Sequence, residues 1–495
     1  MEKLTATDAS FLYSETRHCN SNIGSLNILE LPEEQSSGDF ISSLKTYMSK
    51  RLHTVSYLAR KLAFVPGNWD HPVWVADDRV DMDNHVIEFP VESPGKLADI
   101  ERAVGTIHGI KMPMDKPLWQ MWVLTGLEGN KVAYYNQVHH AAIDGASGNA
   151  AYTVLMDETP DHPAPAEPAA SGPLAEQVSP LQLLEESMKN FLRFHMESGE
   201  RLNGSIDSSR RLMSRALTGG DFGAYGKVAP ATPFNTQIGD TRTWAAGEMP
   251  LADVKQVGKK LGATINDVVM AVCAEGLRTY LERTGNLPED NLIAGCPVSL
   301  RKPGDTKPGT QVTMMNVDLN TSIADPIERL KAIHASAETA KEITADLASA
   351  FEGNASMPGL PAMMQAGISL AEDLGLARYF RGPVNVVISN VPGPRTTLYS
   401  NGAKMISHYP ISIPAHGIGL NITVQSYCDQ LFLGITACGQ AVPDADLLRD
   451  DLINAFRDLR AQLLPTNVSE LNRSAAPVEP TLHVSSQDSL HEKVA

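Results

Sequence analysis

The stretch that decides the fold is Val138-His139-His140-Ala141-Ala142-Ile143-Asp144-Gly145-Ala146-Ser147-Gly148. A strand-like run from Lys131 to Val138 precedes it, and its successive side chains alternate between two faces. Small residues follow, so both histidines lie where a strand ends and the chain turns. Strand ends at the rim of a sheet are where α/β proteins usually hold reactive groups. An imidazole at this place is suited to take a proton from a hydroxyl group near pH 7.

A structural role for these residues is the first alternative. A single histidine is more often structural than catalytic, and Asp144 is also suited to cap a helix that begins near Ala146. The whole pattern His-His-x-x-x-Asp-Gly is far more selective. It resembles the signature of the acyl-CoA-dependent acyltransferases related to chloramphenicol acetyltransferase and to peptide-synthetase condensation domains. The resemblance favours the catalytic interpretation.

Length and charge narrow the possible functions. The 495 residues are enough for two domains, and 42% hydrophobic with 20% charged residues is typical of a globular protein. The net charge of −17 argues against nucleic acid as a partner and against general adhesion to an anionic membrane. A polyanion such as coenzyme A would need a local cluster of basic residues, because the net charge of the whole protein is negative.

Targeting signals are not apparent. No run approaches the ~18 to 20 apolar residues that span a bilayer, and the start of the chain lacks the apolar core of a secretion signal. Five scattered cysteines suggest reduced thiols without metal-type spacing. We expect a cytoplasmic protein, and peripheral contact with a membrane or a lipid inclusion stays open.

The pattern of elements predicts two α/β domains. The N-terminal domain covers residues 1–157 and carries the histidine motif. A Pro-rich linker (158–180), a helical connector (181–228), a C-terminal domain (229–465) and a disordered tail (466–495) follow. The connector contains a long helix from Leu181 to Leu217. We favour a purely connecting role for this helix over a surface that rests on lipid.

Five motifs in order carry a more specific resemblance. They are Thr7-Asp8-Ala9-Ser10-Phe11-Leu12, Pro117-Leu118-Trp119, the double histidine, Asn266-Asp267 and Asn390-Val391-Pro392-Gly393-Pro394. Together they resemble the bacterial wax ester synthase/diacylglycerol acyltransferase family over residues 5–463. The resemblance implies two chloramphenicol-acetyltransferase-like domains with mixed sheets, flanking helices and an active-site tunnel at their interface. It implies transfer of a fatty acyl group from acyl-CoA to diacylglycerol or a fatty alcohol, with no cofactor besides acyl-CoA as co-substrate.

The resemblance assigns the base to His140, whereas His139 packs or shapes the turn. A hydroxyl group that attacks a thioester needs a base, and the departing thiolate needs a proton. One imidazole can serve both steps, which is worth roughly 10²- to 10⁴-fold in rate. The sequence has no Gly-x-Ser-x-Gly elbow, so we expect direct transfer without an acyl-enzyme.

The other motif residues are expected to shape the site. Asp144 is expected to pair with a buried arginine, with Arg60 and Arg301 as candidates, and Gly145 to provide a backbone conformation closed to other residues. Asn266 and Asn390 are candidate donors to the oxyanion, although both also suit local structural roles. Packing and capping roles are expected of Pro117, Trp119 and Asp267. The stretch that ends at Arg301 is followed by Gly309-Thr310, where the family often has Gly-Asn, and this leaves an amide there in doubt.

Three alternatives to an acyltransferase that makes oxygen esters were considered. The first, a metal site, is disfavoured, because adjacent histidines on a strand point to opposite faces and two ligands are too few. A lipid-inclusion binding protein that kept the fold without catalysis is the second. An amide-forming or polyketide-ester-forming relative is the third.

Overall fold

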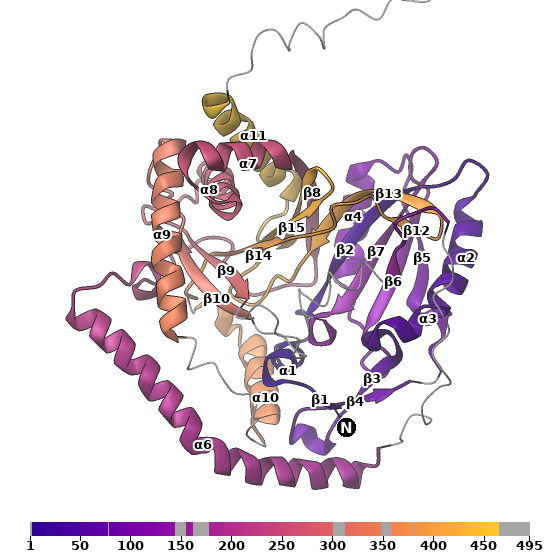
Figure 1. The fold of residues 1–495 in the computed structure, drawn as a ribbon, viewed down its shortest axis with the longest axis horizontal. Helices are drawn as coiled ribbons and strands as arrows, with labels where there is room; N and C mark the ends of the chain where they lie inside the picture. Colours follow the sequence, from indigo (N-terminus) through magenta and orange to yellow (C-terminus); the bar gives the residue numbers. More distant parts are fainter. Residues whose placement is uncertain are drawn as a thin grey trace, which may run out of the picture.

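The computed structural model describes residues 2–77, 79–143, 155–161, 178–299, 312–347, 357, 359–379 and 381–464, and only the backbone of 197–204. Asp144, Gly145, Arg301, most of the predicted linker and the predicted tail lie outside the described residues. Two lobes stand side by side, each built on a six-stranded sheet (Figure 1).

The N-terminal lobe is a largely antiparallel sheet with the strand order β12-β13-β2-β7-β6-β5. In chain order these strands are β2 (Asn22–Glu30), β5 (Val86–Pro90), β6 (Trp119–Thr125), β7 (Lys131–His139), β12 (Tyr399–Ser400) and β13 (Ala403–Ile411). The helices of this lobe include α1 (Ala6–Tyr13), α2 (Ser37–Ser49), α3 (Met82–His85) and α4 (Leu97–His108). A small sheet of β1 (Glu2–Lys3), β4 (Val73–Ala76) and β3 (Arg60–Ala63) and four short helices, η1 (Leu52–Thr54), η2 (Ser56–Ala59), η3 (Pro66–Asn68) and η4 (His140–Ala142), complete it.

The C-terminal lobe is a mixed sheet with the order β10-β9-β11-β14-β15-β8. Its strands are β8 (Arg242–Pro250), β9 (Ile293–Ser299), β10 (Val312–Asp318), β11 (Val386–Val391), β14 (Leu420–Tyr427) and β15 (Gln430–Cys438). Helices α7 (Leu251–Leu261), α8 (Ile265–Arg283), α9 (Pro326–Leu347) and α11 (Ala445–Leu463) belong to this lobe, and α10 (Leu360–Asp373) extends towards the other. Two short helices, η5 (Gly223–Gly226) and η7 (Leu376–Arg378), lie in loops.

One strand pair crosses between the lobes. Strands β12 and β13 follow the C-terminal lobe's β11 in sequence, yet β13 pairs with β2 of the N-terminal sheet. The predicted boundary at residue 229 assigns β12 and β13 to the C-terminal domain, whereas both strands belong to the N-terminal sheet. Hydrophobic periodicity does not reveal such an exchange of strands between lobes. Its physical basis is burial: Ala403, Met405 and Tyr409 of β13 enter the N-terminal core.

The lobes also touch through close backbone contacts. A Cβ atom added to Gly434 of β15 would lie 1.8 Å from the Pro410 carbonyl oxygen of β13, and one added to Gly105 of α4 would lie 2.7 Å from the Arg242 carbonyl oxygen. Only glycine permits these approaches. Trp244 of β8 then packs into the N-terminal core, so the two lobes share buried apolar surface.

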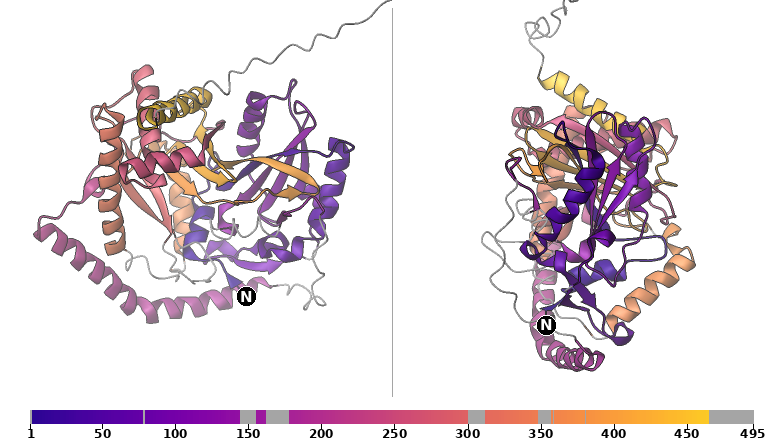
Figure 2. Two further views of the ribbon diagram at one scale, coloured as in Figure 1. Left: turned by 45° about the horizontal axis from the view of Figure 1, so that its top comes forward. Right: turned by 90° about the vertical axis from the view of Figure 1, so that its right-hand side faces the viewer.

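A long helix, α6 (Pro180–Leu217), spans both lobes along one edge of the molecule (Figures 1 and 2). Near its start, Leu183 packs with Val65 and Val73, and near its end Arg215 pairs with Glu342 of α9. The helix predicted over Leu181–Leu217 is confirmed within one residue, with Ser179 as N-cap and Pro180 in the first turn.

Candidate active site

The two histidines occupy the end of β7 and the turn that follows. His139 is the last residue of β7, and His140 opens η4. The His139 amide donates to the Leu118 carbonyl oxygen at 3.0 Å, and the His140 amide donates to the Ser21 carbonyl oxygen at 2.8 Å. Leu118 belongs to the Pro117-Leu118-Trp119 motif, so this motif fixes the backbone of the histidine pair.

The His139 side chain is fully buried and held at both ring nitrogens. Its Nδ1 accepts a hydrogen bond from the Ala141 amide at 3.1 Å. Nδ1 therefore carries no proton, and in the neutral ring Nε2 must be the donor. Nε2 lies 3.2 Å from Oε1 of Glu15, a carboxylate oxygen that accepts this hydrogen. This tautomer and these contacts make His139 a support of the turn.

His140 is partly exposed, and its ring lies against α1. The imidazole stacks on the phenyl ring of Phe11, with ring centroids 3.7 Å apart and an interplanar angle of 12°. Helix α1 is itself fixed by its N-cap Thr5, which accepts from the Asp8 amide at 3.1 Å. The Thr7-to-Leu12 motif therefore provides the surface against which the predicted base is placed.

The segment after α1 joins the two histidines. Oε1 of Glu15 also accepts from the Ser21 amide at 2.8 Å, and the Ser21 hydroxyl donates to the Phe11 carbonyl oxygen at 2.8 Å. Sequence reasoning missed Glu15, because nothing in its local pattern separates it from a solvated carboxylate. Its position three residues after the motif that ends at Leu12 was the available signal.

Pro117 and Trp119 are both buried beside the histidine strand. Trp119 Nε1 donates to the Leu58 carbonyl oxygen at 3.0 Å, and its ring stacks on His85 with centroids 4.3 Å apart. The buried indole is thus held by a hydrogen bond and by ring stacking, which indicates a packing role.

The Asn-Asp and Asn-Val-Pro motifs meet in the C-terminal lobe. Asn390 Nδ2 donates to Asn266 Oδ1 at 2.5 Å. Asp267 completes the capping box with Thr264 that the sequence predicts, and it accepts from His334 of α9 at 2.8 Å. Asn266 is exposed and Asp267 is buried. Asn266 and Asn390 therefore form an amide pair near the surface, whereas the Asp267 carboxylate caps α8.

The arginine partner of Asp144 stays a prediction. Arg60, on β3, forms an ion pair with Glu2, and both side chains are partly exposed. Asp144, Gly145 and Arg301 lie outside the described residues. The predicted pair of Asp144 and an arginine therefore rests on the family resemblance alone.

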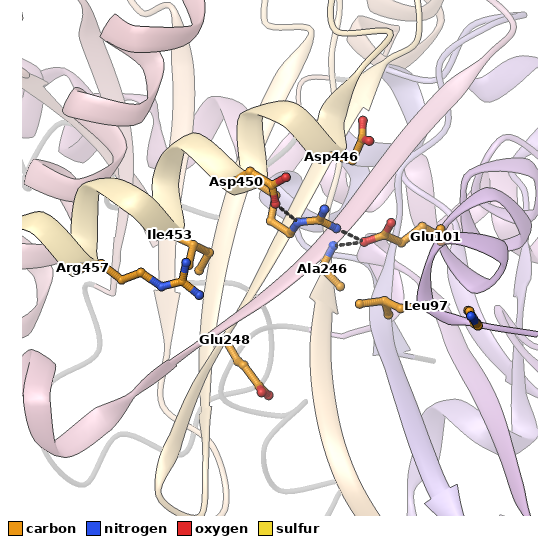
Figure 3. A pocket seen from close by; sticks show the side chains of 11 residues that line it. Leu97, Glu101, Ala246, Glu248, Asp446, Asp450, Ile453 and Arg457 are labelled. Carbon is orange, nitrogen blue, oxygen red and sulfur yellow. Dashed lines mark hydrogen bonds and ion pairs between the residues drawn. The ribbon is translucent and has the colours of Figure 1, made fainter. Parts of the chain in front are cut away.

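A cavity of about 480 Å³ lies between the lobes (Figure 3). Arg449 of α11 crosses it to Glu101 of α4 at 2.7 Å, and Oε1 of Glu101 also accepts from the Ala246 amide at 2.8 Å. Burial raises the pKa of Glu101, although the contacts with the Ala246 amide and Arg449 act to lower it. The cavity adjoins the first turn of α4. The last turn lies about 12 Å further along the helix axis, and there the Asn20 side chain donates to the His108 carbonyl oxygen. The histidine turn is at that far end, so this cavity is a separate feature, and the predicted tunnel stays a prediction.

Comparison with solved structures defines the class of protein. The fold matches a wax ester synthase/diacylglycerol acyltransferase from Marinobacter aquaeolei with a TM-score of 0.66 and 28% identity, over 94% of this chain and 100% of that chain. It also matches the starter condensation domain of rhizomide synthetase in complex with C8-CoA, with a TM-score of 0.52 and 13% identity, over 93% and 94%. The architecture is that of the two-lobed condensation and chloramphenicol-acetyltransferase fold, as the sequence predicted.

Sequence comparison then identifies the family. Residues 4–269 match the wax ester synthase/diacylglycerol acyltransferase catalytic domain, and residues 308–460 match the C-terminal domain of the same family. A candidate diacylglycerol O-acyltransferase of Mycobacterium tuberculosis is 32% identical over 463 residues, which cover 93% of this chain and 90% of the relative. The chain belongs to the wax ester synthase/diacylglycerol acyltransferase family, and it is an acyltransferase. Among its described residues, no helix has the length and apolar character to cross a membrane.

Proposed function

We propose that the protein transfers a long-chain acyl group from acyl-CoA to the hydroxyl group of diacylglycerol, of a fatty alcohol or of both, with His140 as general base. The observation that carries this proposal is the His140 ring. His140 is a partly exposed residue directly after β7, and its ring stacks on Phe11. A general base must be accessible to the acceptor hydroxyl group and must keep a fixed orientation.

The reaction balances with one imidazole. The acceptor oxygen attacks the thioester carbonyl carbon while His140 takes the hydroxyl proton. The tetrahedral intermediate collapses, the carbon–sulfur bond breaks, and the imidazolium returns its proton to the coenzyme A thiolate. The products are an oxygen ester and free coenzyme A, and no acyl-enzyme is formed.

The oxyanion of the intermediate needs a donor, and removal of one such donor typically costs about 10²- to 10³-fold in rate. The Asn266–Asn390 pair supports one assignment. Since the Asn266 oxygen accepts from Asn390, this contact uses one of the two N–H groups of Asn390 and neither N–H group of Asn266. The proposal therefore places Asn266 at the oxyanion and Asn390 behind it as the residue that orients the amide.

A thiol-release assay with palmitoyl-CoA tests this function. Diacylglycerol, hexadecanol and hexadecylamine are offered as acceptors in parallel, with ester or amide products identified by mass. We expect thiol release coupled to ester formation with one or both oxygen acceptors. Amide formation alone would instead indicate the amide-forming class. Absence of release with all three acceptors would indicate a lipid-binding protein without catalysis.

Helix α6 supports contact with a lipid surface. Among the side chains of this helix that the structure describes, eight large apolar ones are exposed, and at 100° per residue they fall within roughly a third of its circumference. They are Leu181, Leu184, Met188, Leu192, Met196, Ile206, Met213 and Leu217. A connector alone would not need this stripe. We propose that it rests on a membrane or a lipid inclusion, from which the acceptor lipid enters.

Flotation with neutral phosphatidylcholine vesicles tests this contact. A variant with Leu181, Met188 and Leu192 changed to Ser should lose most of the vesicle-bound fraction and keep activity on acceptors dispersed in detergent. Leu447→Ser, which changes an exposed leucine of α11, is the matched control. Equal flotation of the α6 variant and the control would contradict the lipid contact.

A further inference from the structure

Helix α10 belongs to the C-terminal half of the sequence but packs on the N-terminal lobe. The Gly359 amide at its start donates to the Trp69 carbonyl oxygen at 2.6 Å, and Asn68 Nδ2 donates to Gln365 at 2.7 Å. Met364 packs against the cluster that contains Leu12 of α1. The helix therefore lies beside the element whose Phe11 stacks on His140.

At the last turn of α10, the carboxylate of Glu372 is buried and fully engaged. Oε1 accepts from the Thr16 hydroxyl at 2.8 Å, from the His18 amide at 3.1 Å and from His18 Nδ1 at 2.9 Å. Oε2 accepts from the Arg17 amide at 3.1 Å. Burial acts to raise the pKa of Glu372, but the hydrogen bonds from Thr16 and His18 outweigh it and the pKa is lowered. The carboxylate is thus a charged anchor for three consecutive residues.

A third element closes the same cluster. His416 Nδ1 accepts from the Ile238 amide at 3.1 Å, so Nε2 carries the ring proton and donates to the Thr16 hydroxyl oxygen at 2.9 Å. The Cys19 amide donates to the same oxygen at 3.2 Å. Thr16 therefore has a single orientation, in which its own proton goes to Glu372.

The anchored residues adjoin both contacts that hold the histidine turn. Glu15, the acceptor for His139 Nε2, immediately precedes Thr16, and Ser21, the acceptor for the His140 amide, follows two residues after Cys19. A shift of this segment moves both supports together. Displacement by about 1 Å at a reacting group can cost up to about 100-fold in rate.

We propose that Glu372 is a positioning residue: by anchoring residues 16–18 it fixes Glu15 and Ser21, and through them the orientation of His139 and His140. This inference rests on the proposed function of His140. It makes the catalytic turn of the N-terminal lobe depend on a carboxylate supplied by the C-terminal half of the chain.

Kinetics of Glu372→Ala, Glu372→Gln and Asp373→Ala test the proposal. Asp373 is the adjacent exposed carboxylate and serves as the matched control. We expect Glu372→Ala to lower kcat by about 10-fold or more with little change in KM for palmitoyl-CoA. Glu372→Gln, which keeps one accepting oxygen, should lose less, and Asp373→Ala should match the wild type.

A double-mutant cycle separates positioning from general damage. If Glu372 acts through Glu15, the double variant with Glu15→Ala should have a kcat close to that of Glu15→Ala alone. Multiplying effects would overturn the proposal, as would an unchanged kcat for Glu372→Ala in an active enzyme.

Hydrogen exchange gives a readout that does not need activity. Peptides that cover residues 15–21 and 139–141 should exchange faster in Glu372→Ala than in Asp373→Ala. Equal exchange would overturn the positioning proposal, whereas a wild type without thiol release would overturn the proposed function instead.

Discussion

The phenyl ring of Phe11 lies flat against the imidazole of His140, with centroids 3.7 Å apart and planes inclined by 12°. Phe11 comes from helix α1, and His140 comes from the turn that follows β7, far along the sequence. The stack restricts the rotation of the imidazole of a partly exposed residue.

Phe11→Leu should lower kcat by about 3- to 10-fold, because a stacked aromatic pair contributes about 0.5 to 1.5 kcal/mol to ring placement. Steady-state thiol release measures the effect. Phe89→Leu is the control, since it removes a partly exposed phenyl ring of β5 that lies in edge contact with Trp122 of β6. If both variants retain wild-type kcat, the stack has no role in placing the base.

Glu15→Ala should lower kcat more strongly, by about 10- to 100-fold, because it removes the acceptor for His139 Nε2 and for the Ser21 amide. Glu15→Gln keeps an accepting oxygen and should be intermediate. The exposed Glu33→Ala should be neutral. A Glu15→Ala enzyme as fast as Glu33→Ala would show that the carboxylate does not support the turn.

Stability should fall as the pH is lowered from about 6.5 towards 4. His71 is buried, its Nδ1 lies 2.8 Å from the Tyr13 hydroxyl, and burial lowers its pKa to about 4. The unfolded chain, with an ordinary histidine pKa near 6.5, binds more protons than the folded chain in this window, so protonation favours unfolding. The full shift corresponds to about 3 kcal/mol. Buried His108 and His408, with pKa values lowered to about 3 and about 4, act in the same direction.

Urea unfolding at pH 7 and pH 5 measures this dependence. Between pH 7 and pH 5, His71→Gln should lose less unfolding free energy than the wild type. His53 is exposed, so His53→Gln should keep the wild-type pH dependence of the unfolding free energy. A wild type with the same unfolding free energy at both values would contradict the assignment.

Gly434→Ala should destabilise the protein by about 1 to 3 kcal/mol, because the new methyl group would overlap the Pro410 carbonyl oxygen where β15 and β13 meet. Thermal unfolding measures the loss. Gly367→Ala, in α10, meets no atom within 4 Å and should be neutral or slightly stabilising. Comparable stability of the two variants would mean that the lobes are not in contact at Gly434.

Local patterns predicted most single elements. The alternation before the histidines indicated β7, and the capping role of Asp267 indicated the beginning of α8. In each case the signal lies within a few neighbouring residues, where periodicity and capping act.

Long-range relationships could not be predicted in this way. The pairing of β13 with β2 joins segments that are far apart in the sequence. The roles of Glu15 and Glu372 likewise depend on partners that are up to 356 residues away. Neither carboxylate differs from a surface residue in its own sequence window. The family motifs marked the histidine turn, but the residues that hold it emerged only from the folded contacts.

The most direct test of the account is the rate of thiol release from palmitoyl-CoA, with the preferred lipid acceptor present, for wild type and His140→Ala. General base catalysis predicts a loss of roughly 10²- to 10⁴-fold in kcat for His140→Ala, with an unchanged unfolding temperature. A folded His140→Ala enzyme that releases thiol at the wild-type rate would contradict the assignment of His140 as the base.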